Sequence, residues 1–498
     1  GENVTAFPRL PRARSALAMT NLGALRIPLS TLHISPSFSR TYRKDHIMSD
    51  IIAAIATGRA PCAIGILRLS GPGCAALTGR VFTPKQPFAD APDRRLVLGL
   101  LHDRQGRVID ECLGVVCRAP HSYTGEETVE LQCHGSPAML AAGLEALLAA
   151  GARQAGPGEF TRRAFLNGKL DLTQAEAVVD LIDAETADAA ANAAGQLGGA
   201  LKRAIGPVYD GLTDLCSHFH AVLDYPDEDI EDFGAAELSG ALDRAGAALR
   251  ELLATYEKGR HLRQGVRAVL LGKPNAGKSS LLNRLAGYDR VIVTDIAGTT
   301  RDTVEEPVRV GRVLLRLTDT AGIREAGDAI EALGVARSEQ AAREAELALF
   351  VCDASQPLTD EDRRAIEAAK CAPRSLALCN KSDLPAAVSP DALPFDTVLT
   401  VSARTGAGLD ALPALLEGWF LGENACDGSL LTNPRQFGAL DRASRAIARA
   451  KAGLSLGVTP DAVLTDVEEA MAALGEVTGR TVREDITNRI FERFCVGK

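Results

Sequence analysis

A glycine-rich run carries the most specific chemistry in this sequence. Residues 272–279 read GKPNAGKS, directly after the apolar residues 269–271 and before the helix-forming residues 281–285. Glycines let main-chain N–H groups close around phosphates, and the N-terminus of the following helix adds positive potential. The lysine of such a run reaches the terminal phosphates, and the serine hydroxyl binds Mg²⁺. The run therefore predicts a nucleotide phosphate site with a magnesium ion.

Two later loops complete the phosphate side of this predicted site. Residues 319–322, Asp-Thr-Ala-Gly, end the predicted strand 314–317, so the acid can hold the Mg²⁺ shell and the glycine N–H can reach the terminal phosphate. Residues 298–302 form a polar loop whose hydroxyls are candidates for the metal. Taken alone, that loop is also typical of an ordinary surface turn.

The base is predicted from two short runs that each follow an apolar strand. They are residues 380–383, Asn-Lys-Ser-Asp, and residues 402–404, Ser-Ala-Arg. A carboxylate such as Asp383 accepts hydrogen bonds from N1 and N2 of guanine, a pattern that adenine cannot offer. Facing adenine, a buried carboxylate would stay unpaired, at a cost of ~1–3 kcal/mol or more. The sequence therefore predicts GTP rather than ATP, and a GTP-hydrolysing switch.

One position departs from the Ras-like pattern. Ile323 follows the Asp-Thr-Ala-Gly run, where Ras-like switches carry a glutamine that orients water. Because an aliphatic side chain cannot orient water, hydrolysis needs another group in the chain or a bound cation. The nearby candidates are Arg324, Glu325, Asp328 and Glu331. Charged residues at such positions are equally typical of a solvated loop.

Length, charge and cysteine usage bound the class of protein. A chain of 498 residues is too long for one core, at ~150 residues per domain. No window approaches the ~18 consecutive apolar residues of a membrane span, so none is expected. The net charge of −9 argues against nucleic acid covering most of the surface, while a local basic patch stays open. Eleven cysteines without a Cys-x-x-Cys pair indicate reduced thiols.

Residues 1–47 differ from the rest of the chain. Glu2 is the only acid before Asp45, and basic residues lie among Ser, Thr and Pro, as in a transit peptide or a disordered tail. We interpret the segment as translated upstream sequence that forms no domain, which predicts a cytoplasmic protein. The alternative, a true transit peptide, would predict a mitochondrial one.

The remaining sequence divides by its hydrophobic periodicity. Short apolar runs punctuated by Gly and Pro predict an α+β domain over residues 51–165. Ala-rich stretches with a period near 3.6 predict helices over residues 173–258 and again over residues 437–494. The nucleotide segment lies between these helical stretches. Because the termini of a compact domain tend to lie close together, we expect it to be inserted into one helical domain built from both flanks.

Beyond the nucleotide motifs, the chain resembles the MnmE/TrmE family of tRNA-modifying GTPases over residues 48–498. The resemblance rests on runs that other GTPases lack. These runs are residues 65–68 (GILR), 122–126 (SYTGE) followed by Glu130-Leu131, 157–165 (PGEFTRRAF), 168–172 (GKLDL) and 494–498 (FCVGK).

The resemblance implies a multidomain α/β architecture. An α+β domain similar to tetrahydrofolate-binding enzymes precedes a discontinuous helical domain, and a Ras-like P-loop G domain is inserted into the latter. The implied bounds are 1–47 for a leader outside the family, 48–167 for the N-terminal domain, 168–262 and 423–498 for the helical domain, and 263–422 for the G domain.

The activity that the resemblance implies is a potassium-stimulated GTPase acting in tRNA modification. With an FAD-containing partner of the MnmG/GidA type, such proteins install a carboxymethylaminomethyl group at C5 of wobble uridine 34 of certain tRNAs. An aminomethyl group is installed when ammonium is the amine source. A tetrahydrofolate derivative, 5-formyl or 5,10-methylene, supplies the one-carbon unit. The resemblance also implies a homodimer, and a heterotetramer with the flavoprotein.

Site residues follow from the resemblance position by position. Folate contacts would come from two cations, a carboxylate and the terminal lysine: Arg68, Glu130, Lys169 and Lys498. Potassium would be held by Asn275, Thr294, Ile296 and Thr299, and would stabilise charge as an arginine finger does.

The resemblance also assigns roles near the chemistry. Mg²⁺ would be held by Ser279 and Thr300, and Glu331 corresponds to the residue that orients water. Cys495 resembles the terminal cysteine of the family. A nucleophile for uridine C6 and a thiol on a packed tail are both consistent with that position.

With the residues that the resemblance adds, the predicted GTP site draws on all the loops described above. Its residues are Gly272, Asn275, Ala276, Gly277, Lys278, Ser279, Ser280, Thr294, Asp295, Ile296, Ala297, Gly298, Thr299, Thr300, Asp319, Thr320, Ala321, Gly322, Asn380, Lys381, Asp383, Ser402, Ala403 and Arg404.

A ribosome-assembly or regulatory GTPase that binds RNA without modifying it is the alternative interpretation of the G motifs. Such a protein would carry an RNA-binding domain in place of Arg68, Glu130 and Lys169, and would lack the tail at residues 495–498. Because both features are present, the sequence favours the modification enzyme.

Overall fold

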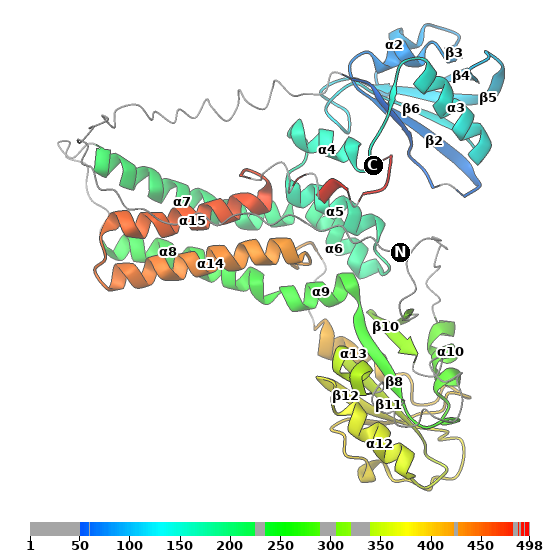
Figure 1. The fold of residues 1–498 in the computed structure, drawn as a ribbon, viewed down its shortest axis with the longest axis vertical. Coiled ribbons are helices and arrows are strands. Elements are labelled where there is room, and N and C mark those ends of the chain that lie inside the picture. The colour runs from blue at the N-terminus through cyan, green and yellow to red at the C-terminus, as the bar shows by residue number, and fades with distance from the viewer. Residues whose placement is uncertain are drawn as a thin grey trace, which may run out of the picture. The chain divides into compact units, whose positions relative to one another are not determined.

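The computed structural model describes most of the chain from Asp50 onward. The described residues are 50–58, 60–224, 235–288, 305–319, 339–422, 427–481, 487, 490–492 and 494–497. Along these ranges a mixed α+β part is followed by a helical part and an α/β part, and further helices close the sequence (Figure 1). No helix among the described residues is long and apolar enough to cross a membrane.

The first part is built on a seven-stranded sheet with strand order β3-β4-β5-β6-β2-β1-β7. Neighbouring strands are antiparallel, except that β1 and β7 are parallel. The strands are β1 (Ile52–Ile55), β2 (Cys62–Ser70), β3 (Phe82–Pro84), β4 (Val97–His102), β5 (Val108–Cys117), β6 (Thr128–Gly135) and β7 (Arg153–Gln154).

One helix, α3 (Pro137–Ala149), packs on one face of this sheet. Gly65 of β2 permits the close approach, because a Cβ there would lie 2.4 Å from Cδ1 of Leu140. Buried leucines such as Leu67 and Leu131 fill the interface. The part also contains α2 (Cys74–Thr78), the short 3-10 helix η1 (Phe88–Asp90) and α4 (Glu159–Leu166).

The helical part takes its core from both sides of the inserted segment. Leu212 and Leu242 from the first flank and Leu440 and Leu474 from the second are fully or almost fully buried in one cluster. Its helices are α5 (Leu172–Ile182), α6 (Ala187–Leu197), α7 (Ala200–Asp224), α8 (Ala235–Ala254), α9 (Tyr256–Gln264), α14 (Pro434–Ser455) and α15 (Pro460–Thr478).

A buried ion pair joins the two flanks of the helical domain. Glu176 of α5 accepts hydrogen bonds from Nε and Nη2 of Arg435 on α14, at 2.7 and 2.8 Å. The amide of Gln436 donates to the same carboxylate at 2.7 Å. Breaking a buried pair by removing one partner costs about 3–5 kcal/mol, so this contact strongly favours assembly of the discontinuous domain.

The inserted part is a six-stranded sheet with order β13-β12-β11-β8-β10-β9. All neighbouring strands are parallel except β9, which is antiparallel to β10. Its strands and helices are β8 (Val266–Leu271), α10 (Lys278–Tyr288), β9 (Glu305–Val310), β10 (Val313–Asp319), β11 (Leu347–Asp353), α12 (Asp360–Ala369), β12 (Arg374–Asn380), η2 (Pro390–Ala392), β13 (Val398–Thr400) and α13 (Ala411–Phe420).

The predicted fold class is confirmed. The mixed N-terminal sheet, the helical domain assembled from two separate stretches and the inserted sheet of mainly parallel strands are all present. β8 lies between β10 and β11, so chain connections leave its C-terminal end in opposite directions. In open parallel sheets this point of reversal is where ligands bind.

Candidate functional site

The predicted nucleotide motifs meet at one edge of the inserted sheet. The register places Asp319 beside Leu270, Phe350 beside Leu271, and Asp353 beside Asn380. Because these strands are parallel, their carboxyl ends share an edge, and the loop of residues 272–277 starts from the middle of it.

The backbone of this phosphate loop requires its glycines. Gly272 has φ 144° and Gly277 has φ 98°, and Asn275 also has a positive φ, of 63°. A Cβ on Gly272 would lie 2.1 Å from the carbonyl oxygen of Val351, and one on Gly277 would lie 2.1 Å from Nδ2 of Asn380. Asparagine tolerates the left-handed region better than most residues. The loop therefore requires glycine at positions 272 and 277 to hold this shape.

The ammonium of Lys278 closes the loop. Nζ donates to the carbonyl oxygens of Gly272 and Lys273 at 2.7 and 2.9 Å. Lys278 also begins helix α10, so the positive end of the helix and the lysine charge lie together. Such a combination suits the terminal phosphates of a nucleotide.

Asn380 ties the phosphate loop to the predicted base loops. Its Nδ2 donates to the carbonyl of Ala276 at 2.9 Å, and its Oδ1 accepts from the N–H of Ala403 at 2.9 Å. The side chain is almost completely buried. One amide thus fixes the distance between the loop for the phosphates and the loop for the base.

The carboxylate predicted to select guanine is held in place by two donors. The hydroxyl of Ser402 donates to Oδ1 of Asp383 at 2.6 Å, and the Arg404 guanidinium lies 2.6 Å from Oδ2. The Ser402 hydrogen bond and the Arg404 charge hold the pKa of Asp383 below its usual range. The group is therefore a carboxylate at neutral pH, as guanine recognition requires.

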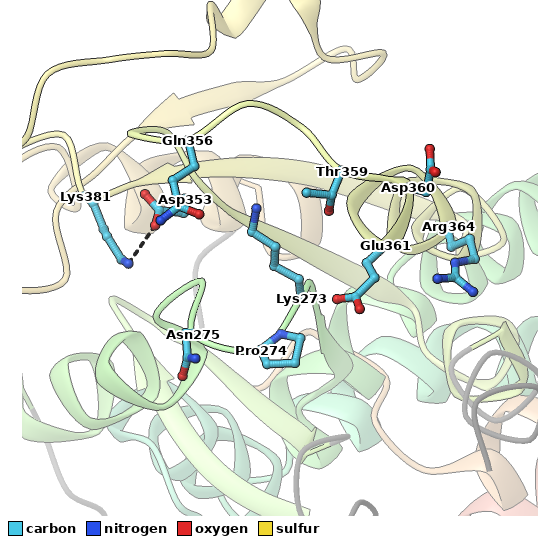
Figure 2. A pocket seen from close by; sticks show the side chains of 10 residues that line it. All are labelled: Lys273, Pro274, Asn275, Asp353, Gln356, Thr359, Asp360, Glu361, Arg364 and Lys381. Carbon is cyan, nitrogen blue, oxygen red and sulfur yellow. Dashed lines mark hydrogen bonds and ion pairs between the residues drawn. The ribbon is translucent and has the colours of Figure 1, made fainter. Parts of the chain in front are cut away.

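A cleft lies beside the phosphate loop, and the ion pair of Lys381 with Asp353 lines it (Figure 2). Lys381 Nζ lies 2.7 Å from Oδ2 of Asp353, and Lys273 Nζ lies 3.0 Å from Oδ2 of the fully buried Asp362. Burial would raise the pKa of Asp353, but Lys381 and Ser355 keep it below the ordinary value. Asn275 lines the same cleft.

Several predicted residues lie outside the described part of the chain. They are Thr294, Asp295, Ile296, Ala297, Gly298, Thr299, Thr300, Thr320, Ala321, Gly322, Glu331 and Lys498. Of the Asp-Thr-Ala-Gly run only the backbone of Asp319 is placed, as the last residue of β10. The predictions that rest on these residues stay predictions.

A second cluster lies in the N-terminal part around Arg68. Arg68 faces Glu130 across β2 and β6, with Nε 2.8 Å from Oε1, and Nη1 donates to the carbonyl of Gly497 at 3.4 Å. Its guanidinium lies over the rings of Tyr123 and Phe160, at 5.7 and 5.8 Å from their centroids. The structure thus brings two of the predicted folate residues into contact.

Lys169, the third described folate residue, reaches the same loop as Tyr123. Its Nζ donates to the carbonyl of Pro120 at 3.2 Å, and its side chain runs beside Gly125. Between these two contacts in sequence, Tyr123 shares a hydrogen bond of 2.8 Å with the hydroxyl of Thr161. Loop 120–127 therefore contacts both Lys169 and Arg68.

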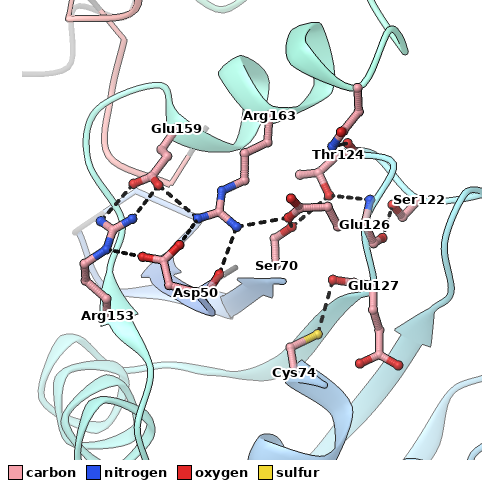
Figure 3. Close-up of polar contacts among 11 residues, drawn as sticks. Asp50, Ser70, Cys74, Ser122, Thr124, Glu126, Glu127, Arg153, Glu159 and Arg163 are labelled. Atoms are coloured by element: carbon pink, nitrogen blue, oxygen red, sulfur yellow. Dashed lines mark hydrogen bonds and ion pairs between the residues drawn. The ribbon is translucent and has the colours of Figure 1, made fainter. Parts of the chain in front are cut away.

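A buried arginine fixes this loop against the sheet (Figure 3). Arg163 of α4 donates to Oε2 of Glu126 at 3.0 Å, and also to Asp50 and Glu159. Burial would raise the pKa of Glu159, but Arg153 and Arg163 keep it below its ordinary value. The network connects the start of the sheet, α4 and the loop.

The end of the chain returns to this cluster. Val496 forms an isolated antiparallel bridge with Pro157, and the N–H of Gly158 donates to the carbonyl of Cys495 at 3.3 Å. Phe491 and Phe494 pack with Phe165 of α4 in an apolar cluster. Cys495 itself is exposed, with its backbone fixed by these contacts.

Sequence reasoning missed several residues of both clusters. Asp353 ends β11 at the same edge as Asn380, so its position at a strand end was a usable signal. The roles of Tyr123, Phe160 and Arg163 depend on contacts between residues 37 to 92 positions apart and have no local pattern.

Comparison with known proteins matches nearly the whole described chain. The profile of the MnmE helical domain matches residues 172–495, and the profile described as the GTP-binding protein TrmE N-terminus matches residues 51–169. The tRNA modification GTPase MnmE of Roseiflexus sp. (strain RS-1) is 44% identical over 468 residues, which cover 91% of this chain and 100% of that protein.

Two further relatives give the same result. The tRNA modification GTPase MnmE of Symbiobacterium thermophilum is 44% identical over 90% of this chain and 99% of that protein. The protein of that name from Aquifex aeolicus is 41% identical over 91% of this chain and 100% of its own length.

Replacing the carboxylate of Asp383 tests the assignment of the base loop. Asp383→Asn substitutes an amide, which can donate where the carboxylate accepts. We expect the affinity for GTP to fall at least tenfold, as for loss of charged hydrogen bonds worth ~1.5–3 kcal/mol, and the affinity for xanthosine triphosphate to rise. Fluorescent nucleotide titration measures both. The exposed Asp391→Asn serves as control, and unchanged GTP affinity with no gain for the xanthine nucleotide would contradict the assignment.

Proposed function

The chain belongs to the MnmE/TrmE family of tRNA modification GTPases, and from this premise we propose its reaction in detail. It is a GTP hydrolase. We propose that it acts with an FAD-containing partner of the MnmG/GidA type. Together they install a carboxymethylaminomethyl group, or an aminomethyl group, at C5 of wobble uridine 34 of certain tRNAs, with a folate one-carbon unit.

The observation that carries this proposal is the presence of two different sites in one chain. At one edge of the inserted sheet, the phosphate loop 272–277 and the loop after β13 are joined through Asn380, as a guanine-nucleotide site would require. The Arg68 cluster in the N-terminal part adds a separate cation, carboxylate and aromatic set next to the C-terminal tail. A GTPase that only binds RNA has no use for the second set.

Wobble nucleosides provide the direct test of the reaction. Mass analysis of tRNA from cells that lack this protein should show loss of both C5-modified uridines, and the intact gene should restore them. Lys278→Ala removes the phosphate-loop ammonium and should not restore them. Lys370→Ala, which removes an exposed lysine, should restore them fully. The proposal would be overturned if tRNA from cells that lack the protein kept both modifications.

We propose that folate binds at the Arg68 cluster. Arg68, Glu130 and Lys169 supply two cations and a carboxylate, which suit a folate's glutamate tail and pterin. The rings of Tyr123 and Phe160 offer flat apolar surface beside the Arg68 guanidinium. Lys498 is proposed as a fourth contact, and the neighbouring Gly497 lies against Arg68.

Titration of the full chain with 5-formyltetrahydrofolate tests this site. Arg68→Met should weaken binding about tenfold or more, because a charge-assisted hydrogen bond is worth ~1.5–3 kcal/mol. Arg107→Met is the matched control, since Arg107 also pairs with a carboxylate, Asp103, in the same domain. Calorimetry measures both dissociation constants. Absence of binding to the unmodified chain would contradict the folate site.

We propose that Mg²⁺ and K⁺ assist GTP hydrolysis. Ser279 and Thr300 would hold Mg²⁺, and Asn275 with Thr294, Ile296 and Thr299 would hold K⁺. Among the described residues the side-chain amide of Asn275 has no hydrogen-bond partner, and it lies exposed at the cleft beside the phosphate loop (Figure 2). Neutral oxygens in a loose cage replace the hydration shell of K⁺. The cation would supply the charge that Ile323 cannot, and Glu331 would orient water.

Turnover in potassium and sodium salts of equal ionic strength tests the cation. Hydrolysis should rise strongly in potassium, since arginine fingers are worth about 10³–10⁵ in rate. Asn275→Ala should remove this response with GTP binding largely kept. Asn275→Gly, which accepts the positive φ without strain, should behave alike. Glu331→Ala should lower hydrolysis while the potassium-driven dimer still forms. A potassium effect below twofold would contradict the proposal.

We also propose a homodimer in the cytoplasm, which associates with the flavoprotein as a heterotetramer. Ile64 of β2 and Leu98 and Leu100 of β4 are exposed, and the strand register places them on the sheet face opposite α3. Apolar side chains left exposed on one face of a sheet offer surface to a partner chain. All ten cysteines in the described part of the chain are free thiols, which supports a reducing compartment.

A further inference from the structure

Away from both sites, two thiols and a carboxylate converge at one end of the N-terminal sheet. Asp110 and Cys112 lie two residues apart on β5, so they point to the same face. Cys133 of β6 is opposite Cys112, one step along the register that pairs Leu113 with Gln132. The two Sγ atoms and a carboxylate oxygen of Asp110 all lie within 4.8 Å of one another.

The carboxylate is oriented by its neighbour His134. The main-chain N–H of His134 donates to Oδ2 of Asp110 at 2.8 Å, and Nδ1 lies 2.7 Å from Oδ1. The Asp110 side chain is only 8% exposed, whereas the His134 side chain is 79% exposed. Carboxylates that bind metals are commonly held by hydrogen bonds of this kind. The histidine follows Cys133 on β6, so it orients the carboxylate from outside the set of three ligand atoms.

The electrostatics of the cluster favour a cation. Both cysteines are buried. A carboxylate oxygen of Asp110 lies within 4.8 Å of both Sγ atoms. A divalent cation among these three atoms would be attracted by the carboxylate and would stabilise the thiolates directly.

We propose that Asp110, Cys112 and Cys133 bind a thiophilic divalent cation of the zinc class. Binding would release the two thiol protons to solvent and form two metal–sulfur bonds and one metal–oxygen bond. Tetrahedral zinc with bonds of about 2.3 Å to sulfur sets its ligand atoms about 3.8 Å apart, so the cluster needs to contract by about 1 Å at most. Water would complete the coordination. The metal would link β5 to β6.

The inserted domain offers a matched control for this cluster. Cys352 and Cys379 are also buried on neighbouring strands, with Sγ atoms 3.9 Å apart. Among the described residues, no third ligand atom lies within the range that defines the Asp110 cluster. If two neighbouring thiols were enough to bind the metal, the pair Cys352 and Cys379 would bind it too. The proposed site requires the carboxylate as well.

Metal titration of the reduced full chain tests the proposal. The protein is stripped with a chelator, saturated with Mg²⁺ to fill the sites that prefer oxygen ligands, and titrated with ZnCl₂ or CoCl₂. Zinc retained after gel filtration should be one per chain, and cobalt should give thiolate charge-transfer absorption. Cys112→Ser and Cys133→Ser should abolish both signals, and Asp110→Asn should weaken zinc binding at least tenfold. Cys352→Ser should leave them unchanged.

Clear outcomes would overturn the site. An unmodified chain that gives no cobalt–thiolate absorption after reduction would exclude the metal, whether or not the variants fold. Thiols are also counted before reduction, and a disulfide between Cys112 and Cys133 at that stage would contradict a metal site. A reduced pair that binds no metal would overturn the proposal equally. So would zinc retention that is the same in the unmodified chain and in Cys112→Ser.

Discussion

The buried amide of Asn380 is the contact on which the nucleotide site depends. One side of the amide accepts from Ala403 of the base loop, and the other donates to Ala276 of the phosphate loop. Leaving a buried donor or acceptor unpaired costs about 1–3 kcal/mol, so neither loop can shift without loss of stability. The close approach also explains Gly277, because any Cβ there would strike Nδ2. Residues more than 100 positions apart are therefore fixed together by a single side chain.

The phosphate loop and the order of the domains could be predicted from the sequence, because short local patterns determine them. The run at 272–279 fixes its own backbone through glycines, and the apolar strands around it fix its place in a parallel sheet. The discontinuous helical domain also followed from periodicity. What could not be predicted are contacts that join distant residues: Asp353 with Lys381, Arg163 with Glu126, and Cys112 with Cys133. Each contact joins segments that only the folded chain brings together, so the local sequence around one partner does not identify the other.

The insertion of a whole domain between two helical flanks is less costly than its length suggests. The entropy of closing a chain segment rises only with the logarithm of its length, at about 0.6 kcal/mol per doubling. The inserted segment is itself folded, which brings its ends together further. Against that small cost stand the shared apolar core of the two flanks and the paired charges of Glu176 and Arg435. The helical domain can therefore form from two stretches that are far apart in sequence.

Strand β10 belongs to the predicted nucleotide site and also contacts the helical domain. It ends at Asp319, the acid predicted for the magnesium shell, and within the same strand Arg316 pairs with Glu185 at 2.6 Å and donates to the carbonyl of Gln264 at 2.6 Å. Arg312, just before the strand, pairs with Asp188 of α6 at 2.5 Å. A displacement of the strand at the nucleotide end would strain these ion pairs, because a strand transmits motion along its length more readily than a loop does. The strand that ends at the acid predicted for the magnesium shell is therefore also joined to the helical domain by an ion pair.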